Sequence, residues 1–232
     1  MQDIEIWHKD LRAVIEKHDI QPENIYNFDE TGIRVGCVSG EEVIVPKNST
    51  TVYTASPENR RSISIIETIS AAGKTIPPVL IIQAKLHMES WYHENLQGDE
   101  LILLSESGYT NKLLGMEYLR HFIQHIKAGL DTPKKLLMDS HISHCNPDFI
   151  LLADEYQIIS YAFPSHLTHV LQPLDVGVFQ PYKYWHKKAI QHALRSLDVD
   201  YNIAFFLRDL TDIRYNIFKI GTVKNAWKKT DI

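Results

Sequence analysis

The order of apolar and periodic segments predicts a mixed α/β fold, in which helices cover both faces of one sheet. Residues 62–70 and 75–83 are rich in β-branched side chains and are joined by Ala-Ala-Gly-Lys, which is typical of a β-hairpin. Two later apolar runs, 135–139 and 158–164, each follow a helical segment, as parallel strands do. With one strand before the hairpin, ending at Asp29, the expected sheet has five strands of mixed direction.

The other segments are expected to be helical, apart from one insertion. Ile4, Trp7 and Leu11 are spaced by three and four residues, which predicts an amphipathic helix over residues 3–18. Proline is favoured in the first turn of a helix, so another helix is expected from Pro147. Further helices are expected over residues 115–128, 182–197 and from 202 onward, with a candidate short strand at 43–46 and an insertion without clear periodicity at about 84–112.

Length and composition are those of a globular domain. The 232 residues fit one large domain, or one domain with an insertion, and 44% hydrophobic with 23% charged residues is ordinary. No apolar run approaches the ~20 residues that cross a bilayer, so no membrane partner is expected. Cys37 and Cys145 form no CxxC pair, which argues against a Cys-based zinc centre and favours a reducing compartment. The net charge of −5 argues against a surface that grips nucleic acid everywhere, but not against a local basic track.

Three aspartates lie at the ends of predicted strands or at the start of a predicted helix, next to apolar residues. Asp29 and Asp139 close apolar runs that are expected to be buried strands, and Asp175 opens a predicted helix. A buried carboxylate is costly unless something pairs with it, and several acids in one place favour a divalent cation. Ligands gather at the carboxyl ends of strands in α/β sheets, so neighbouring strands would bring Asp29 and Asp139 side by side. Such acids can hold two metal ions ~3.5–4 Å apart and support phosphoryl chemistry.

A structural role is the alternative for these acids. Aspartate is common in turns and at helix caps, so Asp29 would form a turn and Asp175 would cap a helix. The residues around the acids distinguish the two interpretations.

Each aspartate lies in a longer motif. The motifs read NFDETG at Asp29, LLMDSHISH at Asp139 and PSHLTHVLQPLDVGVFQPYK at Asp175. Together they resemble the catalytic domain of DDE-superfamily transposases of the pogo and Tigger branch, a group that includes centromere protein B-like derivatives. The resemblance spans residues 25–188, and the last motif is the most specific of the three.

The resemblance implies a ribonuclease-H-like fold and an endonuclease that cuts and joins DNA with Mg²⁺ or Mn²⁺. The family's three acids match Asp29, Asp139 and Asp175, which would bind two ions. The implied partners are transposon ends and target DNA, with a homodimer as a further expected assembly and the nucleus as the expected location. The expected organisation is a linker helix at 1–21, a catalytic domain at 22–198 and a helical tail at 199–232.

Residues beside the acids are expected to support them. Glu30 would point to the face of its strand opposite the first acid, so hydrogen bonding around the site is favoured over direct metal binding. The same supporting role is favoured for His141 and His144, because the further ligands of a zinc site are missing near them. His166 and His169 also lack such ligands and are expected at the rim of the site or in packing.

Lys183, Lys187 and Lys188 follow Asp175 on a predicted helix and are expected to contact DNA phosphates. An ordinary solvated helix face is the alternative for these lysines.

Two other functions are consistent with the same residues. One is a domesticated relative that binds DNA or a protein partner without cutting. The other is a metal-dependent nuclease or phosphatase unrelated to transposition. Transposases of this branch carry helix-turn-helix modules before the catalytic domain, whereas one predicted helix precedes Asp29 here. Sequence-specific grip on DNA is therefore expected to reside outside this chain.

Overall fold

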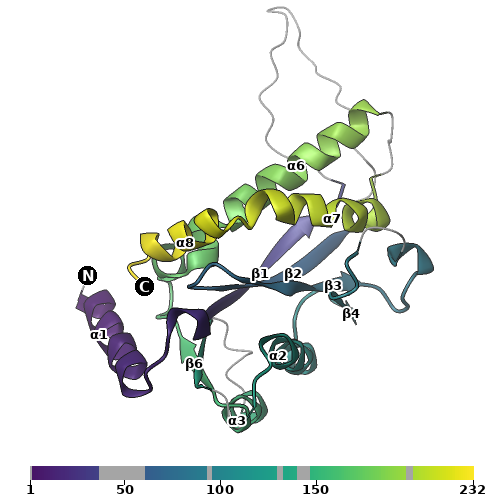
Figure 1. The fold of residues 1–232 in the computed structure, drawn as a ribbon. Helices are drawn as coiled ribbons and strands as arrows, with labels where there is room; N and C mark the ends of the chain where they lie inside the picture. Colours follow the sequence, from purple (N-terminus) through teal and green to yellow (C-terminus); the bar gives the residue numbers. More distant parts are fainter. Residues whose placement is uncertain (1, 37–60, 93–95, 130–132, 140–146, 197–200) are drawn as a thin grey trace, which may run out of the picture.

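The fold is a six-stranded mixed sheet with helices on both faces (Figure 1). The computed structural model describes residues 2–36, 61–92, 96–129, 133–139, 147–196 and 201–232. The strand order is β4-β3-β2-β1-β5-β6. β1, β2 and β3 pair antiparallel, while β4, β5 and β6 each run parallel to the neighbouring strand on their inner side. The strands are β1 Ile25–Arg34, β2 Ser62–Ser70, β3 Thr75–Gln83, β4 Leu101–Ser105, β5 Lys135–Asp139 and β6 Ile158–Ala162.

The helices form a layer on each face of the sheet. α2 and α3 share one buried cluster with the sheet, and α5, α6, α7 and α8 share the other. The mixed α/β class with helices on both faces is therefore confirmed. None of the helices in the described part of the chain has the length and apolar character needed to span a lipid bilayer. The helices are α1 Gln2–Lys17, α2 Lys112–Ile126, α3 Pro147–Glu155, α4 Thr168–Leu171, α5 Pro173–Gly177, α6 Phe179–Arg195, α7 Ile203–Ile217 and α8 Ile220–Lys229, with short 3-10 helices η1 Pro22–Asn24 and η2 Glu89–Trp91.

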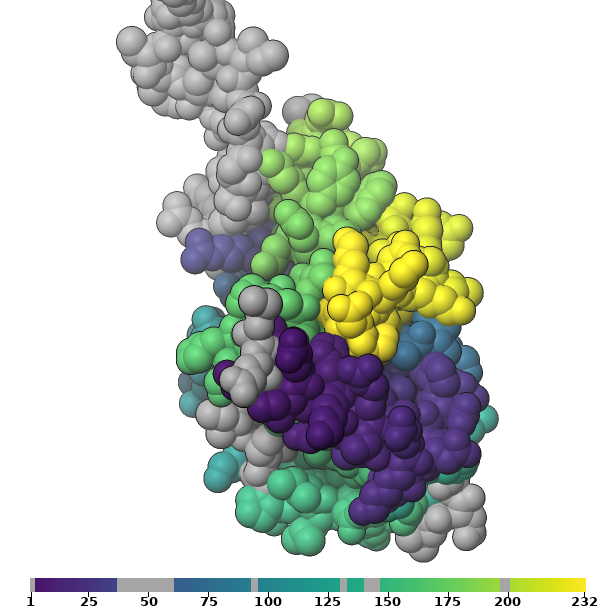
Figure 2. Space-filling view, turned by 90° about the vertical axis from the view of Figure 1, so that its left-hand side faces the viewer, coloured from purple at the N-terminus to yellow at the C-terminus, as the bar shows by residue number. Residues whose placement is uncertain are grey.

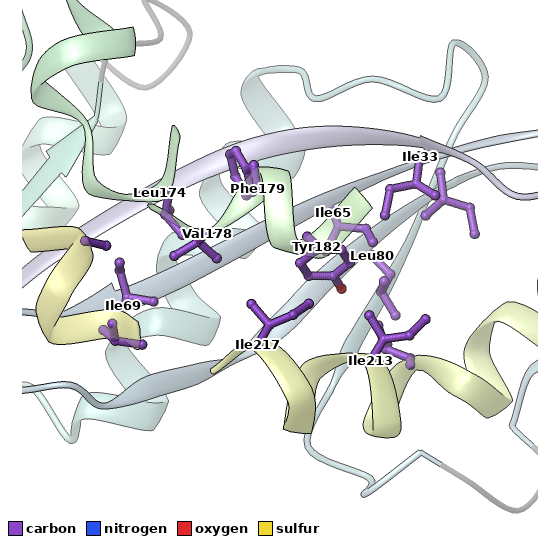
Figure 3. Close-up of a cluster of buried hydrophobic side chains, with 14 of the residues drawn as sticks. Ile33, Ile65, Ile69, Leu80, Leu174, Val178, Phe179, Tyr182, Ile213 and Ile217 are labelled. Atoms are coloured by element: carbon purple, nitrogen blue, oxygen red, sulfur yellow. The ribbon is translucent and has the colours of Figure 1, made fainter. Parts of the chain in front are cut away.

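The central strands are apolar on both sides because both helical layers bury them. Alternate residues of β2 point to opposite faces, so Ile65 and Ile69 join the α5–α8 cluster while Ile66 joins the α2–α3 cluster. Figure 3 shows the first cluster, where side chains of the sheet meet those of α5, α6 and α7. Its labelled members are Ile33, Ile65, Ile69, Leu80, Leu174, Val178, Phe179, Tyr182, Ile213 and Ile217.

β1 extends beyond its expected end at Asp29. Its antiparallel pairing with β2 is unbroken from Tyr26, opposite Ser70, to Arg34, opposite Ser62. Thr31-Gly32, a pair that favours a turn after the predicted strand end, is part of this ladder, because backbone hydrogen bonds to β2 keep it extended. The predicted strand end was therefore wrong, and Asp29 lies in the middle of β1.

The expected insertion at 84–112 contributes the sixth strand. β4 pairs parallel with β3, from Val79 opposite Leu101 to Gln83 opposite Ser105. Its sequence LILLS lacks alternation, because the strand is partly covered on both faces, and this hides it from pattern analysis. The expected count of five strands was one too few, while the candidate strand at 43–46 falls outside the described residues.

The C-terminal helices belong to the same core as the sheet. Ile213 and Ile217 of α7 and Trp227 of α8 lie in the buried cluster that contains Ile65 and Ile69. Gly177 at the end of α5 packs directly on α8, since an added Cβ would lie 2.5 Å from the Cβ of Ala226. α8 can therefore approach α5 this closely only because residue 177 is glycine.

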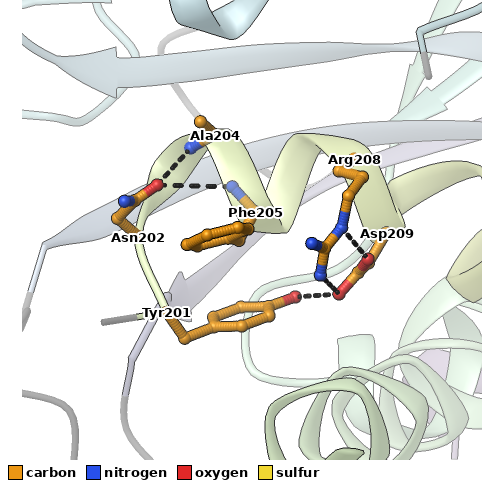
Figure 4. Close-up of polar contacts among 6 residues, drawn as sticks. All are labelled: Tyr201, Asn202, Ala204, Phe205, Arg208 and Asp209. Atoms are coloured by element: carbon orange, nitrogen blue, oxygen red, sulfur yellow. Dashed lines mark hydrogen bonds and ion pairs between the residues drawn. The ribbon is translucent and has the colours of Figure 1, made fainter. Parts of the chain in front are cut away.

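Polar contacts fix the start of α7 (Figure 4). The Asn202 side chain caps the helix by accepting hydrogen bonds from the backbone N–H groups of Ala204 and Phe205. The Tyr201 hydroxyl donates to the Asp209 carboxylate at 3.0 Å, and Arg208 pairs with the same carboxylate at 2.8 Å. These contacts orient the helix that carries Arg214.

The two ends of the chain lie next to each other (Figure 2), and the N-terminal helix contacts β6. In Figure 2 the purple α1 and the yellow C-terminal segment lie next to each other on one face. The indole N–H of Trp7 donates to the Ala162 carbonyl at 3.0 Å, and the ring stacks on Phe163 with centroids 5.3 Å apart. α1 therefore packs beside the end of the edge strand β6.

A buried ion pair joins α7 to the sheet, and we predict a large cost for breaking it. Glu67 of β2 is fully buried and pairs with Arg214, which also donates to the Ile76 carbonyl at 3.1 Å. Arg214→Met leaves the Glu67 carboxylate without its counter-charge, so we expect a loss of about 3–5 kcal/mol in unfolding free energy, measured by urea denaturation.

The matched control for this prediction is Arg120→Met, which breaks an exposed pair with Glu117 on α2. It should cost about 0–1 kcal/mol. An Arg214 variant as stable as the Arg120 variant would contradict the structural role of the pair.

Candidate active site

One buried side chain ties together the three elements that carry the aspartates. Asn27 of β1 is fully buried. Its amide nitrogen donates to the Phe28 carbonyl at 3.2 Å and to the Met138 carbonyl of β5 at 3.1 Å, and its amide oxygen accepts from the Leu174 N–H of α5 at 3.0 Å.

The three partners of Asn27 share one property. Phe28, Met138 and Leu174 are the residues immediately before Asp29, Asp139 and Asp175. A single side chain therefore sets the backbone positions from which all three acids project.

The strand pairing places Asp29 and Asp139 at the same edge of the structure. Within the described residues, β1 pairs with β5 at Ile25, Tyr26 and Asn27, and the last of these lies opposite Met138. Asp29 thus lies just beyond the paired stretch, and Asp139 is the final residue of β5. Since the strands are parallel, both acids lie past the same end of this pairing, although only Asp139 ends its strand and β1 continues to Arg34.

Alternation along the strands assigns the acids to faces of the sheet. Ile25 and Ile33 of β1 join the α5–α8 cluster, so Asp29 shares their face and points toward α5. Asp139 shares parity with Leu137, which joins the opposite cluster. Among the described residues, no three His, Cys, Asp or Glu side chains already stand in an arrangement that could hold a metal ion.

The charges of the three acids nevertheless act on one another. The pKa of Asp29 is raised to about 8, chiefly by burial and then by the neighbouring carboxylates of Asp175 and Asp139, against the opposing effect of a backbone hydrogen bond from Glu30. Asp175 is exposed as a residue, but desolvation of its carboxyl still raises its pKa.

The groups beside Asp175 act in the opposite direction. The Thr168 hydroxyl, Lys183 and His169 each lower the pKa of this carboxyl, because they stabilise its charged form. Mutually repelling carboxylates are the donor set that a hard divalent cation prefers, so these residues fit Mg²⁺ or Mn²⁺ in chemistry. A counter-charge would relieve the repulsion between Asp29 and its two neighbours.

The predicted supporting residues have different surroundings. Glu30 accepts a hydrogen bond from the Thr110 hydroxyl, just ahead of α2, and so links β1 to that helix. His141 and His144 fall outside the described residues. His166 and His169 are exposed, and His169 lies close enough to Asp175 to influence its charge.

Of the three lysines of α6 that are predicted to contact DNA, two share one side of the helix and the third lies on another. Lys183 and Lys187 line a cavity beside the end of β1. Lys188 lies over the Tyr184 ring, 5.5 Å from its centroid, and lines a different cavity next to α7.

Asn27 and Glu67 are two buried polar residues whose contacts the sequence analysis did not predict. Both interrupt apolar runs that were correctly predicted to be strands. A polar residue inside such a run must find partners when it is buried, so its position alone is a usable signal.

We predict that replacing Asn27 damages both the fold and metal binding. Asn27→Leu conserves volume but leaves buried backbone groups of Met138 and Leu174 without their partner, at about 1–3 kcal/mol each. Thermal unfolding should show this loss and also a smaller increase in Tm on adding Mn²⁺. Asn202→Ala, which removes the α7 cap, should cost about 1 kcal/mol and keep the full Mn²⁺ response. An unchanged Mn²⁺ response in Asn27→Leu would argue against the anchoring role.

Stability without divalent cations should depend on pH through Asp29. Its pKa of about 8 lies above the ordinary value of 3.8, so the folded chain binds this proton more tightly than the unfolded chain does. The resulting stabilisation is complete below the ordinary pKa and is lost as the pH rises through about 8. In EDTA, we expect Tm to fall between about pH 4 and pH 8, and to fall less in Asp29→Asn.

Addition of Mn²⁺ at the alkaline end of this range should restore Tm in the wild type, because the cation binds only the folded state. Identical pH profiles for the two proteins in EDTA would contradict the assigned environment of Asp29.

The sequence of this chain is similar to those of a known protein family. Residues 59–227 match the DDE superfamily endonuclease family. The chain is 31% identical over 187 residues to a Cochliobolus lunatus protein named MFS-type transporter clz9, covering 80% of this chain and 20% of that protein.

Solved structures of Mos1 have the same fold. The Mos1 strand transfer complex aligns with a TM-score of 0.55 at 12% identity, over 99% of this chain and 60% of the Mos1 chain. The mariner Mos1 paired end complex with Mg aligns with a TM-score of 0.51 at 12% identity, over 99% and 61%. The chain thus spans a fifth of its curated relative and about three fifths of the Mos1 chains.

At this identity the likeness to Mos1 shows the fold alone, which confirms the expected ribonuclease-H-like class. The family match covers most of the sequence, and the chain belongs to the DDE superfamily of endonucleases.

Proposed function

We propose that this chain is the catalytic domain of a pogo-type DNA transposase, which hydrolyses phosphodiester bonds and transfers DNA strands. Asp29, Asp139 and Asp175 are the proposed ligands of Mg²⁺ or Mn²⁺, as two ions. The observation that carries the proposal is the hydrogen bonding of Asn27 to the residues preceding all three acids. A structural set of aspartates would have no need of such a common anchor.

The acids have complementary properties for this chemistry. Divalent cations, when bound, polarise a phosphodiester and lower the pKa of an attacking water or hydroxyl. Asp29 holds a proton near neutral pH in the free protein, since its pKa is raised to about 8, and releases it when positive charge arrives. Thr168 and Lys183 favour the charged form of Asp175, which keeps this carboxylate ready as a ligand.

DNA is the proposed partner, as transposon ends and as target, and the nucleus is the proposed location. Among proteins of the same fold, Mos1 is described in a strand transfer complex and in paired end complexes with Mg and with Mn. The paired ends in those descriptions favour two copies of the chain acting together. A module that binds DNA without cutting it is the alternative, and the following experiment distinguishes the two.

We predict Mn²⁺-dependent nicking of supercoiled plasmid DNA by this chain. Asp29→Asn, Asp139→Asn and Asp175→Asn should each reduce nicking to background, because each removes a charged ligand without changing side-chain volume. Asp212→Asn, at an exposed position of α7, is the matched control and should nick at the wild-type rate. Gel electrophoresis of relaxed and supercoiled plasmid gives the rates.

Two other outcomes would reject the assignment. Wild-type nicking that persists in all three site variants would exclude these acids from the reaction. DNA binding without nicking in Mg²⁺ or Mn²⁺ would instead support the non-cleaving alternative.

A further inference from the structure

A basic groove lies between the end of β1 and the first turns of α6. Its volume is about 460 Å³. Figure 1 shows α6 passing near the end of β1, and residues of both elements form the walls. The lining residues are Gly32, Ile33 and Arg34 of β1 with Lys183, Tyr184, His186 and Lys187 of α6.

The charge of this groove is positive although the chain as a whole is acidic. Arg34 and Lys183 are exposed and Lys187 is half-buried. None of the described residues that line the groove is acidic, whereas the net charge of the chain is −5. Burial lowers the pKa of His186 to about 4, so this histidine is neutral at physiological pH and the charge comes from the arginine and the lysines.

Two other cavities that contain basic residues also contain acids, whereas a cavity beside Gly177 is lined by Lys228 and Lys229 and lies away from β1. The cavity beside Lys188 also contains Asp209 and Asp212 from α7. The cavity beside Arg214 contains Asp99 and Glu100. In both of these, acidic side chains would repel an anion.

The groove begins close to the proposed metal ligands. Gly32 and Arg34 follow Asp29 by three and five residues on one continuous strand, which places them ~10–17 Å away along β1. Lys183 lies near enough to Asp175 to lower the pKa of that carboxyl. The groove therefore extends from the acids toward the far end of β1.

The helix period separates the groove lysines from their neighbour. Lys183 and Lys187 are four residues apart and lie on the same face of α6. Lys188 is rotated by about 100° from Lys187 and lines the cavity next to α7.

We propose that this groove binds the phosphate backbone of one DNA strand, about three to five nucleotides from the phosphate that reacts at the three acids. The spacing follows from the ~10–17 Å along β1 and the 3.4 Å rise per nucleotide. The inference rests on the proposed function for the position of the reacting phosphate. The groove's affinity for DNA can be tested apart from cleavage.

The first test measures binding of a short mixed-sequence DNA duplex in Ca²⁺ over a range of NaCl concentrations. Each phosphate contact contributes about 0.9 to the slope of log K against log salt concentration. Arg34→Gln and Lys183→Gln should each lower that slope by about one, and their combination by about two. Arg120→Gln and Lys9→Gln, exposed residues of α2 and α1, are the matched controls and should leave the slope unchanged.

Lys188→Gln distinguishes a groove from a general attraction to α6. The proposal expects a smaller loss of slope for this variant than for Lys183→Gln. Equal losses at the two lysines, wild-type slopes in both groove variants, or no DNA binding by the wild type would each overturn the proposal. Thermal unfolding of every variant shows whether the fold is kept.

The second test examines the position of the contact. Nick sites on the duplex are first mapped, and single uncharged methylphosphonate linkages are then placed at successive distances from the strongest site. A linkage three to five nucleotides away should weaken DNA binding by the wild type more than linkages elsewhere, and should add little to the loss in Lys183→Gln. Additive losses at every distance would overturn the assigned position.

The two tests separate this inference from the proposed function. A wild type that binds DNA through the groove but never nicks would refute the cleavage assignment and support the groove. A wild type whose nicking depends on the three acids, with groove variants that bind normally, would refute the groove and leave the function standing.

Discussion

The arrangement of the site depends on the hydrogen bonding of Asn27. β1, β5 and α5 come from three distant parts of the chain, and each contributes one acid. Asn27 contacts the backbone immediately before each of those acids, with three hydrogen bonds between 3.0 and 3.2 Å. The Asn27 side chain is fully buried, so water could not replace these hydrogen bonds if they were broken. The backbone positions of Phe28, Met138 and Leu174 are therefore coupled.

Two acids on the same face of the sheet, the half-buried Asp29 and the fully buried Glu67, have neighbours that differ in the sign of their charge. Asp29 lies directly opposite Glu67 in the β1–β2 ladder. Glu67 is neutralised by Arg214 of α7, whose guanidinium also lies 4.6 Å from the centre of the Phe218 ring. Asp29 has like charges as neighbours, and its pKa is raised to about 8. The C-terminal helices thus supply a counter-ion to Glu67, whereas the charged groups that act most strongly on Asp29 are carboxylates, and Asp29 is the acid for which we propose a divalent cation.

Much of the fold can be predicted from the periodicity of apolar residues along the sequence. Most of the features that were not predicted depend on contacts between residues far apart in the sequence. The hairpin of β2 and β3, the two later strands and the main helices have strong periodicity, and the structure contains them all. The end of β1 was misplaced because pairing with β2 outweighs the turn preference of Thr31-Gly32. β4 was not predicted, because a short edge strand that is partly covered on both faces shows no alternation of apolar and polar residues. The three acids were proposed from their motifs and their places at predicted strands and helices, whereas the contacts of Asn27 and Glu67 depend on partners far away in sequence.

The central claim is that Asp29, Asp139 and Asp175 form one divalent cation site. Its most direct test is anomalous diffraction from crystals of the chain soaked in Mn²⁺ above the pKa of about 8 for Asp29. We expect anomalous density in contact with all three carboxylates, with their side chains drawn together relative to the metal-free arrangement. Density that contacts only one of the three, or Mn²⁺ bound elsewhere while these acids stay apart, would contradict the account.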